Sequence, residues 1–313
     1  MNPLVSIVLP TYNGEKYIRK SIESCLSQSY TNLELIIVND CSKDNTLSIV
    51  KEYAARDSRV KVINNAKNKK LPLSLNAGFE EATGTYFTWT SDDNFYTSNA
   101  IECLVTAITS HQNIDLVYTD YFTIDDSDQV TGEMHFGDIN QSFMEWKGCG
   151  ACFLYHAEVH KKNNGYDPST VLIEDYDFFL RAYLHSTFLY LKRSDLYYYR
   201  LHAASLTGTM SDAVFDIQKI TVEKRIPILL PKLKGRDITL LYRKYTVYYS
   251  LFKNNNRKTA YFLELLYRQS VSQAILTIFY IAGKKMLQYF QVVPFLFYSF
   301  IRLLFKGGRS EIK

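Results

Sequence analysis

Two adjacent carboxylates, Asp92 and Asp93, follow the apolar segment GTYFTWT at residues 84–90. Such neighbours repel each other unless a cation lies between them and a ligand. Mg²⁺ or Mn²⁺ suits that place, because hard cations bind one or two carboxylates together with the phosphate oxygens of a substrate. The alternative is an acidic turn before a helix, with Asn94 or Ser98 as its cap, and an isolated acidic pair would favour that turn.

The elements that must position this pair follow a regular alternation over the first ninety residues. Apolar, β-branched runs predict strands at 4–10, 33–40, 60–63 and 84–90, and helical spacing predicts helices at 14–29, 42–56 and 72–82. Ser42 is the expected cap of the second helix, with Asp44 in its first turn. This pattern predicts an α/β fold, Rossmann-like, with a mostly parallel sheet covered by helices on both faces.

Ligands of such sheets bind where the strands end, and polar residues follow three of these strands. These are Thr11–Asn13, Asp40 and Ser91–Asn94. Neither GxGxxG nor GxxxxGK[ST] follows any strand, so the two common glycine-rich phosphate loops are absent. A bound phosphate would therefore need another source of positive charge, and a cation at Asp92–Asp93 would supply it.

The pattern changes near residue 114 to aromatic, strand-like segments. Strands are expected at 115–123, 130–136, 150–155 and 195–201, with a helix at 175–184, which predicts a mixed, partly antiparallel extension. Residues 212–268 have helical spacing, and 271–305 are apolar and aromatic. We expect one domain at 1–210 and a helical C-terminal region at 211–313.

Composition limits the class of protein. With 313 residues and 47% hydrophobic content the chain is globular, and a net charge of +4 is too weak to indicate nucleic acid but suits phosphorylated substrates or anionic lipid. No secretory signal is visible, so a cytoplasmic location with reduced cysteines is expected. Cys149 and Cys152 form a CxxC without a second ligand pair, which favours small buried residues beside a strand over zinc or redox chemistry.

Five ordered segments, spread over about residues 4–208, resemble the family 2 glycosyltransferases, which have the GT-A fold. They are SIVLPTYNGEKYIRKSIESCLSQSY, LELIIVNDCSKDNT, NAGFEEATGTYFTWTSDD, EDYDFFLR and YYYRLHAASLT. The resemblance implies an inverting, metal-dependent transferase that takes a sugar from a nucleotide donor.

The resemblance also implies a nucleotide site. The loop after the first strand, Pro10, Thr11, Tyr12 and Asn13, would hold the nucleotide, and Tyr12 could stack on the base. Asp40 matches the acid that accepts a hydrogen bond from the base, which suits the N3–H of uracil and favours a UDP donor.

Three further positions match family residues around the diphosphate. Asn76 matches an asparagine of the family, but Leu75 stands where an arginine is common. The missing positive contact would come from Lys69, Lys70 or Arg200, and Arg200 lies in the stretch that closes over the diphosphate.

The metal motif departs from the usual D-x-D-D, because Thr90 replaces its first aspartate. Some members have a similar TDDN arrangement, so Asp92 and Asp93 keep the Mn²⁺ or Mg²⁺ site. The sequence does not decide which of the two binds the ion and which contacts the ribose. His202 matches a histidine that can join the metal as a neutral imidazole.

Glu174 and Asp175 match the family's ED motif, in which the aspartate is the general base that takes a proton from the acceptor hydroxyl. The alternative is structural: acids stabilise the first turn of a helix, and Asp177 would be an exposed partner of Arg181 four residues on. The acceptor side would comprise Glu174, Trp146 and Gly148, with Gly148–Gly150 allowing close backbone approach.

The C-terminal region leaves three interpretations open. Residues 286–305 carry Arg302 as their one charge but contain Pro294 near the middle, and basic residues flank them, as at an interfacial helix beside anionic lipid. Peripheral membrane contact through 271–305, packing in a homo-oligomer and a true membrane span are the alternatives. The acceptor is expected to be a glycan or lipid-linked glycan of surface polysaccharide biosynthesis. Competing functions are a nucleotidyltransferase and a non-catalytic nucleotide-sugar-binding scaffold.

Overall fold

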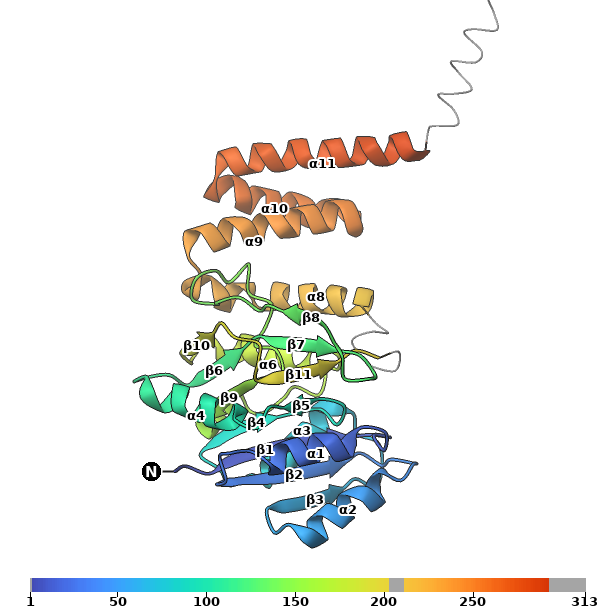
Figure 1. Cartoon of the computed structure of the whole chain (residues 1–313). Helices are drawn as coiled ribbons and strands as arrows, with labels where there is room; N and C mark the ends of the chain where they lie inside the picture. The colour runs from blue at the N-terminus through green and yellow to red at the C-terminus, as the bar shows by residue number, and fades with distance from the viewer. Residues whose placement is uncertain (1, 203–210, 293–313) are drawn as a thin grey trace, which may run out of the picture. The chain divides into compact units, whose positions relative to one another are not determined.

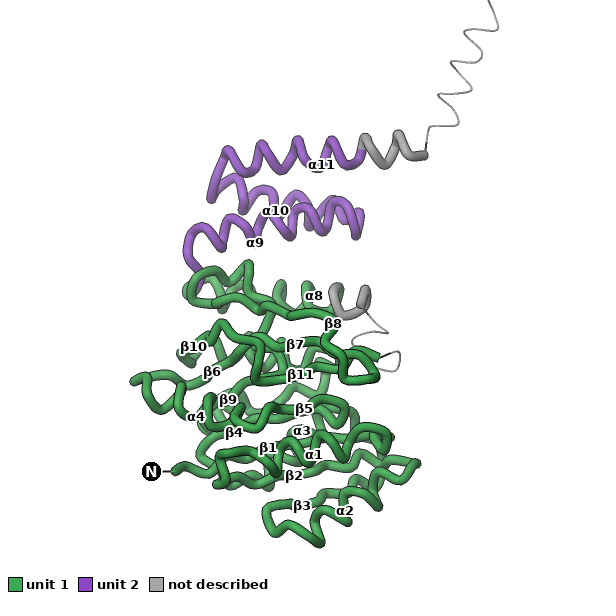
Figure 2. Tube along the Cα trace, viewed as in Figure 1, with its two compact units in different colours: residues 1–232 green, residues 233–313 purple. Residues whose placement is uncertain are grey.

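The computed structural model describes residues 2–202 and 211–292, which form two compact units, residues 1–232 and 233–313 (Figures 1 and 2). The predicted domain boundary at residue 210 therefore lies within the first unit, just before helix α8 (Ser211–Leu229).

A seven-stranded sheet forms the centre of the first unit, in the order β10-β6-β9-β4-β1-β2-β3. Its strands are β1 (Val5–Thr11), β2 (Leu33–Asn39), β3 (Val60–Asn64), β4 (Tyr86–Trp89), β6 (Leu116–Thr119), β9 (Phe153–His156) and β10 (Phe188–Leu191). All neighbours are parallel except β9, which is antiparallel to β4 and β6. Every residue of β1 and β2 is buried, which explains their continuous apolar character. The predicted GT-A-type α/β fold with a mostly parallel sheet is confirmed.

A second sheet, in the order β5-β11-β7-β8, extends the first unit. It contains β5 (Phe95–Tyr96), β11 (Tyr197–Arg200), β7 (Tyr121–Ile124) and β8 (Val130–Met134), and it mixes parallel and antiparallel pairs. Helices α1 (Ile18–Leu26), α2 (Thr46–Arg56), α3 (Leu71–Glu80), α4 (Ala100–Ser110), α5 (Ala157–Lys162) and α6 (Glu174–Ala182) connect the strands. Of these, α3 packs on β1 and β2, and α4 packs on β6 and β9.

The four strands and three helices predicted before residue 95 are all present, but the predicted cap of α2 is wrong. The helix begins at Thr46, and Asp44 Oδ1 accepts hydrogen bonds from the backbone N–H and hydroxyl of Thr46. The Ser42 hydroxyl instead accepts from the backbone N–H of Asn13, so it joins two loops at the edge of the sheet.

The predicted strand at 115–123 is two strands in different sheets, β6 and β7, which meet at buried Asp120. Its carboxylate accepts hydrogen bonds from the Phe136 N–H and the Tyr190 hydroxyl, contacts that the local pattern does not encode. The pattern also missed β5, β10, α4 and α5.

The second unit contains α9 (Gly235–Val247), a π-helical turn (Tyr248–Phe252), α10 (Asn256–Gln269) and α11 (Val271–Val292), with α9, α10 and α11 packed against one another. The predicted helical character of 212–268 is confirmed. Of the apolar segment 286–305, the backbone to residue 292 belongs to α11, and the rest lies outside the described residues. Within the described part, no helix combines the length and apolar character needed to cross a bilayer.

Candidate active site

The loops after β1 and β4 meet at Asp92. The Thr11 hydroxyl donates to Asp92 Oδ2 at 2.5 Å, which joins the ends of the two strands. Gly14 allows this approach, because a Cβ there would lie 2.2 Å from Asp92 Oδ2 and 2.6 Å from Thr11 Oγ1. Glycine at position 14 is therefore required by the close contact between loop and carboxylate.

The pKa values of both adjacent carboxyl groups, Asp92 and Asp93, are raised. Burial raises the pKa of Asp92 to about 7, and the charge of Asp93 adds to the effect. Burial also raises the pKa of Asp93, although His202 opposes this increase. The His202 Nε2 atom lies 3.0 Å from Asp93 Oδ2, so the structure brings together two of the three predicted metal residues, which are 109 positions apart.

The residues present fit a divalent cation. Asp93 Oδ1 is buried and has no hydrogen-bond partner among the described residues. Two neighbouring, partly buried carboxylates are destabilised by desolvation and mutual repulsion, which a bound cation would relieve. Asp93 and the His202 imidazole beside it offer an oxygen and a nitrogen ligand of the kinds that Mg²⁺ or Mn²⁺ accepts, whereas Asp92 Oδ2 is held by the Thr11 hydroxyl.

Arg200 holds the loop after β4 with a buried side chain. Its side chain is 2% exposed, and it donates to the backbone carbonyls of Asp93 (3.0 Å) and Asp125 (2.6 Å) and to the Asp128 carboxylate. Its guanidinium also lies 4.5 Å from the centre of the Tyr17 ring. All its terminal groups are engaged with protein in this state, so the predicted diphosphate contact of Arg200 stays a prediction.

Asp40, at the end of β2, holds the loop before α3. Its Oδ1 accepts from the Asn65 side-chain amide (2.9 Å) and the Lys69 backbone N–H (2.8 Å), and its Oδ2 accepts from the Lys70 N–H (2.9 Å). A carboxylate offers about four acceptor positions, so one on Oδ2 is left for a ligand. Lys69 and Lys70 contact Asp40 through their backbone N–H groups, and a diphosphate contact of either side chain stays a prediction.

The remaining nucleotide candidates differ in accessibility. Pro10 is buried within β1, whereas Tyr12 is 49% exposed and presents a free aromatic ring at the sheet edge. Asn13, with φ of 56°, joins the loop after β2 by accepting from the Lys43 N–H. Asn76 exchanges two hydrogen bonds of 2.8 Å with the backbone of Tyr166, which gives it a structural task.

Asp175 lies in the first turn of α6 and is partly buried. Its Oδ1 accepts from the Tyr176 backbone N–H at 2.6 Å, and burial raises its pKa. Burial also raises the pKa of Glu174, with the Asp175 charge as a second cause, and Glu174 Oε2 has no partner among the described residues. A buried carboxyl group with a raised pKa suits a general base.

Tyr166 connects this turn to the end of β4. The Trp89 indole donates to the Tyr166 hydroxyl at 2.9 Å, and the pKa of Tyr166 is raised by burial and, to a smaller extent, by the charges of Asp175 and Glu174. The charges in the first turn of α6 therefore act on Tyr166, which is hydrogen-bonded to Trp89 of β4.

The predicted acceptor-side residues gather around Tyr176. Trp146 is 4% exposed and stacks on Tyr176 with ring centres 5.6 Å apart, and its Nε1–H has no partner among the described residues. Gly148 has a φ of 117°, which strongly favours glycine, and a Cβ there would lie 3.7 Å from the Tyr176 ring. These residues bring an unpaired indole N–H close to the helix turn that carries Glu174 and Asp175.

The sequence did not predict a second group with metal-ligand chemistry, Asp120, Glu133 and His135. One ligand atom of each lies within 4.8 Å of the others, and His135 Nδ1 is 3.0 Å from Asp120 Oδ2. The β6–β7 junction and β8 bring them together, so residue spacing gave no signal for it. Both oxygens of Asp120 accept hydrogen bonds within the protein, which accounts for its burial without an ion.

The two CxxC residues are buried next to a strand, as predicted. Cys149 and Cys152 are buried free thiols beside β9. Burial raises the pKa of the Cys149 thiol well above its ordinary value and that of Cys152 to about 12. Such thiols are poor nucleophiles and poor metal ligands at neutral pH.

Comparison with known proteins settles the family. The family model described as Glycosyl transferase family 2 matches residues 6–185, more than half of the chain. The chain belongs to glycosyl transferase family 2. It is 31% identical over 248 residues to a glycosyltransferase of Rickettsia prowazekii, which covers 72% of this chain and 76% of that one. The glycosyltransferase GlyG of Streptococcus pneumoniae is 28% identical over 266 residues, with 77% and 85% covered.

Solved structures agree on the fold. The S. aureus protein TarS, residues 1–349 in complex with UDP-GlcNAc, superposes with a TM-score of 0.64 at 18% identity, covering 84% of this chain and 81% of that one. Its complex with UDP gives a TM-score of 0.60 at 20% identity, with 80% and 73% covered. This glycosyltransferase is therefore an enzyme with the fold of TarS, and the predicted alternatives of a nucleotidyltransferase and a non-catalytic scaffold are set aside.

Proposed function

We propose that this glycosyltransferase moves a sugar from a UDP donor to a glycan or lipid-linked acceptor with inversion, in surface polysaccharide biosynthesis. The observation that carries the proposal is the arrangement at the end of β4, where Asp93 lies 3.0 Å from His202 and keeps one buried oxygen without a hydrogen-bond partner among the described residues. TarS, similar in fold, has been solved with UDP and with UDP-GlcNAc, which supports a uridine nucleotide.

The base-recognition part of the proposal rests on Asp40 and Tyr12. The free acceptor position on Asp40 Oδ2 suits the N3–H of uracil, and the exposed Tyr12 ring offers a stacking face. A base without that N–H would leave the carboxylate less satisfied, which favours UDP over nucleotides that lack the donor.

The reaction uses Asp175 as the general base. The acceptor hydroxyl oxygen attacks the anomeric carbon while the bond from that carbon to the β-phosphate oxygen breaks, and UDP leaves with the bonding electrons. The hydroxyl proton passes to Asp175, and attack opposite the leaving group inverts the configuration. Held by Asp92, Asp93 and His202, a divalent cation would neutralise the negative charge of the diphosphate.

The acceptor side supports a hydroxyl-rich substrate. Trp146 Nε1 is a buried donor and Glu174 Oε2 a buried acceptor, each without a partner among the described residues. A sugar hydroxyl both donates and accepts, so a glycan could satisfy one or both groups when it binds. Gly148 would leave room for the acceptor beside Tyr176.

Binding of the donor is tested by thermal shift with UDP, GDP, UDP-GlcNAc, UDP-glucose and UDP-galactose, each with Mn²⁺, Mg²⁺ or EDTA. We expect stabilisation by UDP compounds that requires metal and is lost in Asp93→Asn. Equal stabilisation by GDP, or stabilisation unchanged by EDTA, would contradict the donor and metal assignments.

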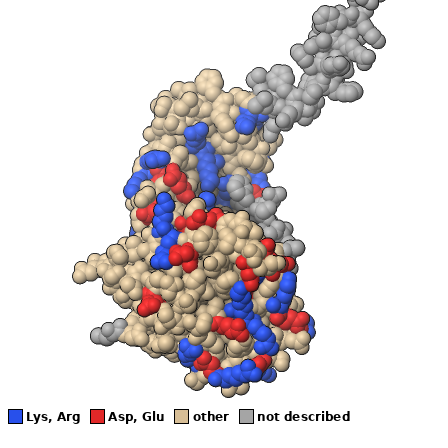
Figure 3. All heavy atoms as spheres, viewed as in Figure 1, with Lys and Arg blue, Asp and Glu red and all other residues tan. Residues whose placement is uncertain are grey.

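For the second unit we propose peripheral contact with an anionic membrane on the cytoplasmic side. Helix α11 exposes apolar side chains at helical spacing, namely Val271, Ile275, Ile278 and Phe279. Residues 265–310 contain no Asp or Glu but six Lys or Arg. At the top of the surface in Figure 3, where α11 lies in the same view, tan and blue atoms prevail. An apolar stripe with basic neighbours suits insertion into an anionic bilayer surface.

Co-sedimentation with phosphatidylglycerol and phosphatidylcholine vesicles tests this surface. We expect binding to the anionic vesicles that weakens in Phe279→Ser but not in the control Phe252→Ser, another exposed aromatic residue outside the stripe. No vesicle binding, together with a dimer by light scattering that Phe279→Ser dissociates, would assign the stripe to a homo-oligomer instead.

A further inference from the structure

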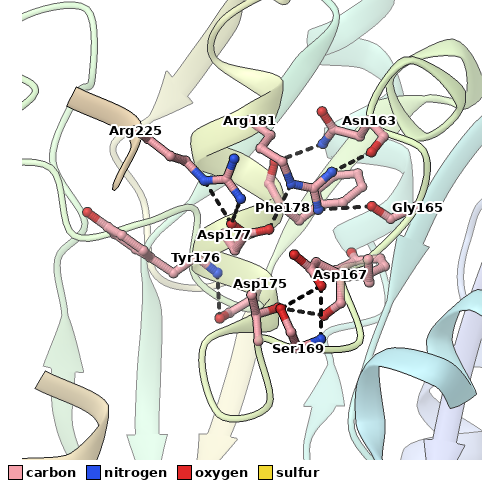
Figure 4. A network of polar contacts seen from close by, with 12 residues as sticks. Asn163, Gly165, Asp167, Ser169, Asp175, Tyr176, Asp177, Phe178, Arg181 and Arg225 are labelled. Atoms are coloured by element: carbon pink, nitrogen blue, oxygen red, sulfur yellow. Dashed lines mark hydrogen bonds and ion pairs between the residues drawn. The ribbon is translucent and has the colours of Figure 1, made fainter. Parts of the chain in front are cut away.

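Asp177 is a buried carboxylate held by two arginines. Its side chain is 0% exposed, which corrects the sequence-based expectation of an exposed ion pair. Arg181 Nε donates to Asp177 Oδ2 at 2.7 Å, and Arg225 donates to Oδ1 through Nε at 3.0 Å and through Nη2 (Figure 4). Both oxygens of the carboxylate are thus used by guanidinium groups.

The two arginines come from different parts of the chain. Arg181 belongs to α6 itself, and its remaining groups donate to the carbonyls of Asn163 and, at 2.9 Å, Gly165 (Figure 4). Arg225 belongs to α8, which lies beyond the family match at residues 6–185. Arg181 therefore pairs α6 with the preceding turn, whereas Arg225 connects α6 to a helix that follows the family region.

Neutralising Asp177 requires one positive charge, and Arg181 provides it at hydrogen-bonding distance. Arg225 adds a second, two-point contact from a side chain that is 23% exposed. Because a guanidinium is a planar fork, two donors on one oxygen fix direction as well as distance. The second arginine therefore adds geometric restraint to a charge that is already paired.

The restrained carboxylate lies in the turn that carries the base. Asp177 follows Asp175 by two residues, and side chains at that spacing point to different sides of a helix. Figure 4 shows Asp177 turned toward Arg225 and Arg181, with Asp175 on the neighbouring part of the turn. A contact at Asp177 thus restrains the turn on a different side of the helix from Asp175. It does not occupy the side on which Asp175 would meet a hydroxyl.

We infer that Arg225 of α8 is a positioning residue that fixes the first turn of α6, and with it Asp175, for proton transfer. The inference rests on the proposed function, in which Asp175 is the base. It predicts that losing the contact disturbs the chemical step and spares donor binding, since among the described residues the hydrogen bonds of Arg225 go to Asp177 and none goes to the loops after β1, β2 and β4. A misplacement of about 1 Å in a catalytic group can cost about a hundredfold in rate.

The test compares Arg225→Met, Arg225→Lys and the control Arg56→Met, which removes an exposed arginine paired with Glu52. UDP release from UDP-GlcNAc, UDP-glucose and UDP-galactose with Mn²⁺, water acting as acceptor, gives kcat and KM, and UDP titration gives Kd. We expect Arg225→Met to lower kcat about tenfold to a hundredfold with KM and Kd within about twofold of wild type. Arg225→Lys, which keeps one charged donor, should recover part of the loss.

The outcomes distinguish a positioning role of Arg225 from a purely structural role. A lower melting temperature with unchanged kcat would assign Arg225 a purely structural role and overturn the inference, as would a parallel loss of kcat and UDP binding. If Arg225→Met does not fold, the kcat of Arg225→Lys at unchanged Kd decides instead. Asp175→Asn is measured alongside: wild-type turnover there refutes the proposed base, whereas loss there with a normal Arg225→Met refutes the positioning role alone.

Discussion

Replacing Asp92 with asparagine should stabilise the metal-free protein at alkaline pH. Burial and the charge of Asp93 raise the pKa of Asp92 to about 7, whereas the ordinary value is 3.8. A carboxyl whose pKa is higher in the folded state stabilises the fold while it is protonated. That contribution is complete below pH 3.8 and is lost as the pH rises through about 7.

The magnitude follows from that difference in pKa. At about 1.36 kcal/mol per pKa unit, it corresponds to at most about 4 kcal/mol at pH 8. Because Asp92 keeps some exposure to solvent, we expect about 2 kcal/mol of stabilisation in Asp92→Asn. For a domain of this size that is a rise of roughly 4–8 °C in the melting temperature.

Thermal unfolding in EDTA at pH 5 and pH 8 measures this effect, followed by addition of Mn²⁺. Asp92→Asn should exceed wild type at pH 8, by less at pH 5, and Mn²⁺ should stabilise wild type more than the variant. Asp44→Asn is a control of opposite sign, because hydrogen bonds from Thr46 and Glu15 outweigh burial and lower the pKa of Asp44. An Asp92→Asn variant less stable than wild type at pH 8 would refute the reasoning.

Three further substitutions test other parts of the site. Gly14→Ala places a Cβ 2.2 Å from Asp92 Oδ2, so the Asp92 carboxylate or the loop must shift, and UDP affinity by calorimetry should fall about tenfold or more. Asp40→Ala removes an acceptor from three N–H groups; those of Asn65 and Lys70 keep a second acceptor, and that of Lys69 keeps none among the described residues, so the free energy of unfolding in urea should fall by about 1–3 kcal/mol; an unchanged midpoint would contradict this. Trp146→Phe keeps an aromatic ring to stack on Tyr176 but removes the indole N–H, so it should raise the acceptor KM and leave the donor KM unchanged in steady-state kinetics.

The sequence predicted the parallel half of the fold well because each of its elements has its own local signal. The buried runs of β1 and β2 and the helical spacing of α1 to α3 need no knowledge of distant contacts. The break between β6 and β7 was missed because its cause, the Asp120 carboxylate, is bound by residues 16 and 70 positions away.

Sequence motifs predicted the residues of the candidate site but not the contacts that hold them in place. Asp93 and His202 are in contact, as the resemblance implied, and Asp175 lies in the first turn of a helix. No motif predicted how the carboxylates are held. Arg200 donates to backbone carbonyls, including that of Asp93, and Arg225 of α8 donates to Asp177. Such contacts join segments far apart in the chain, so residue spacing does not predict them.

The central claim is that Asp175 is the base of an inverting transfer from a UDP-sugar. Its most direct test is turnover by wild type and Asp175→Asn with the UDP-sugar that stabilises the protein, with the anomeric configuration of the product followed by NMR. We predict inversion by wild type, and in Asp175→Asn a loss of turnover of about a hundredfold or more with UDP binding retained. Retention of configuration, or an Asp175→Asn enzyme as active as wild type, would contradict it.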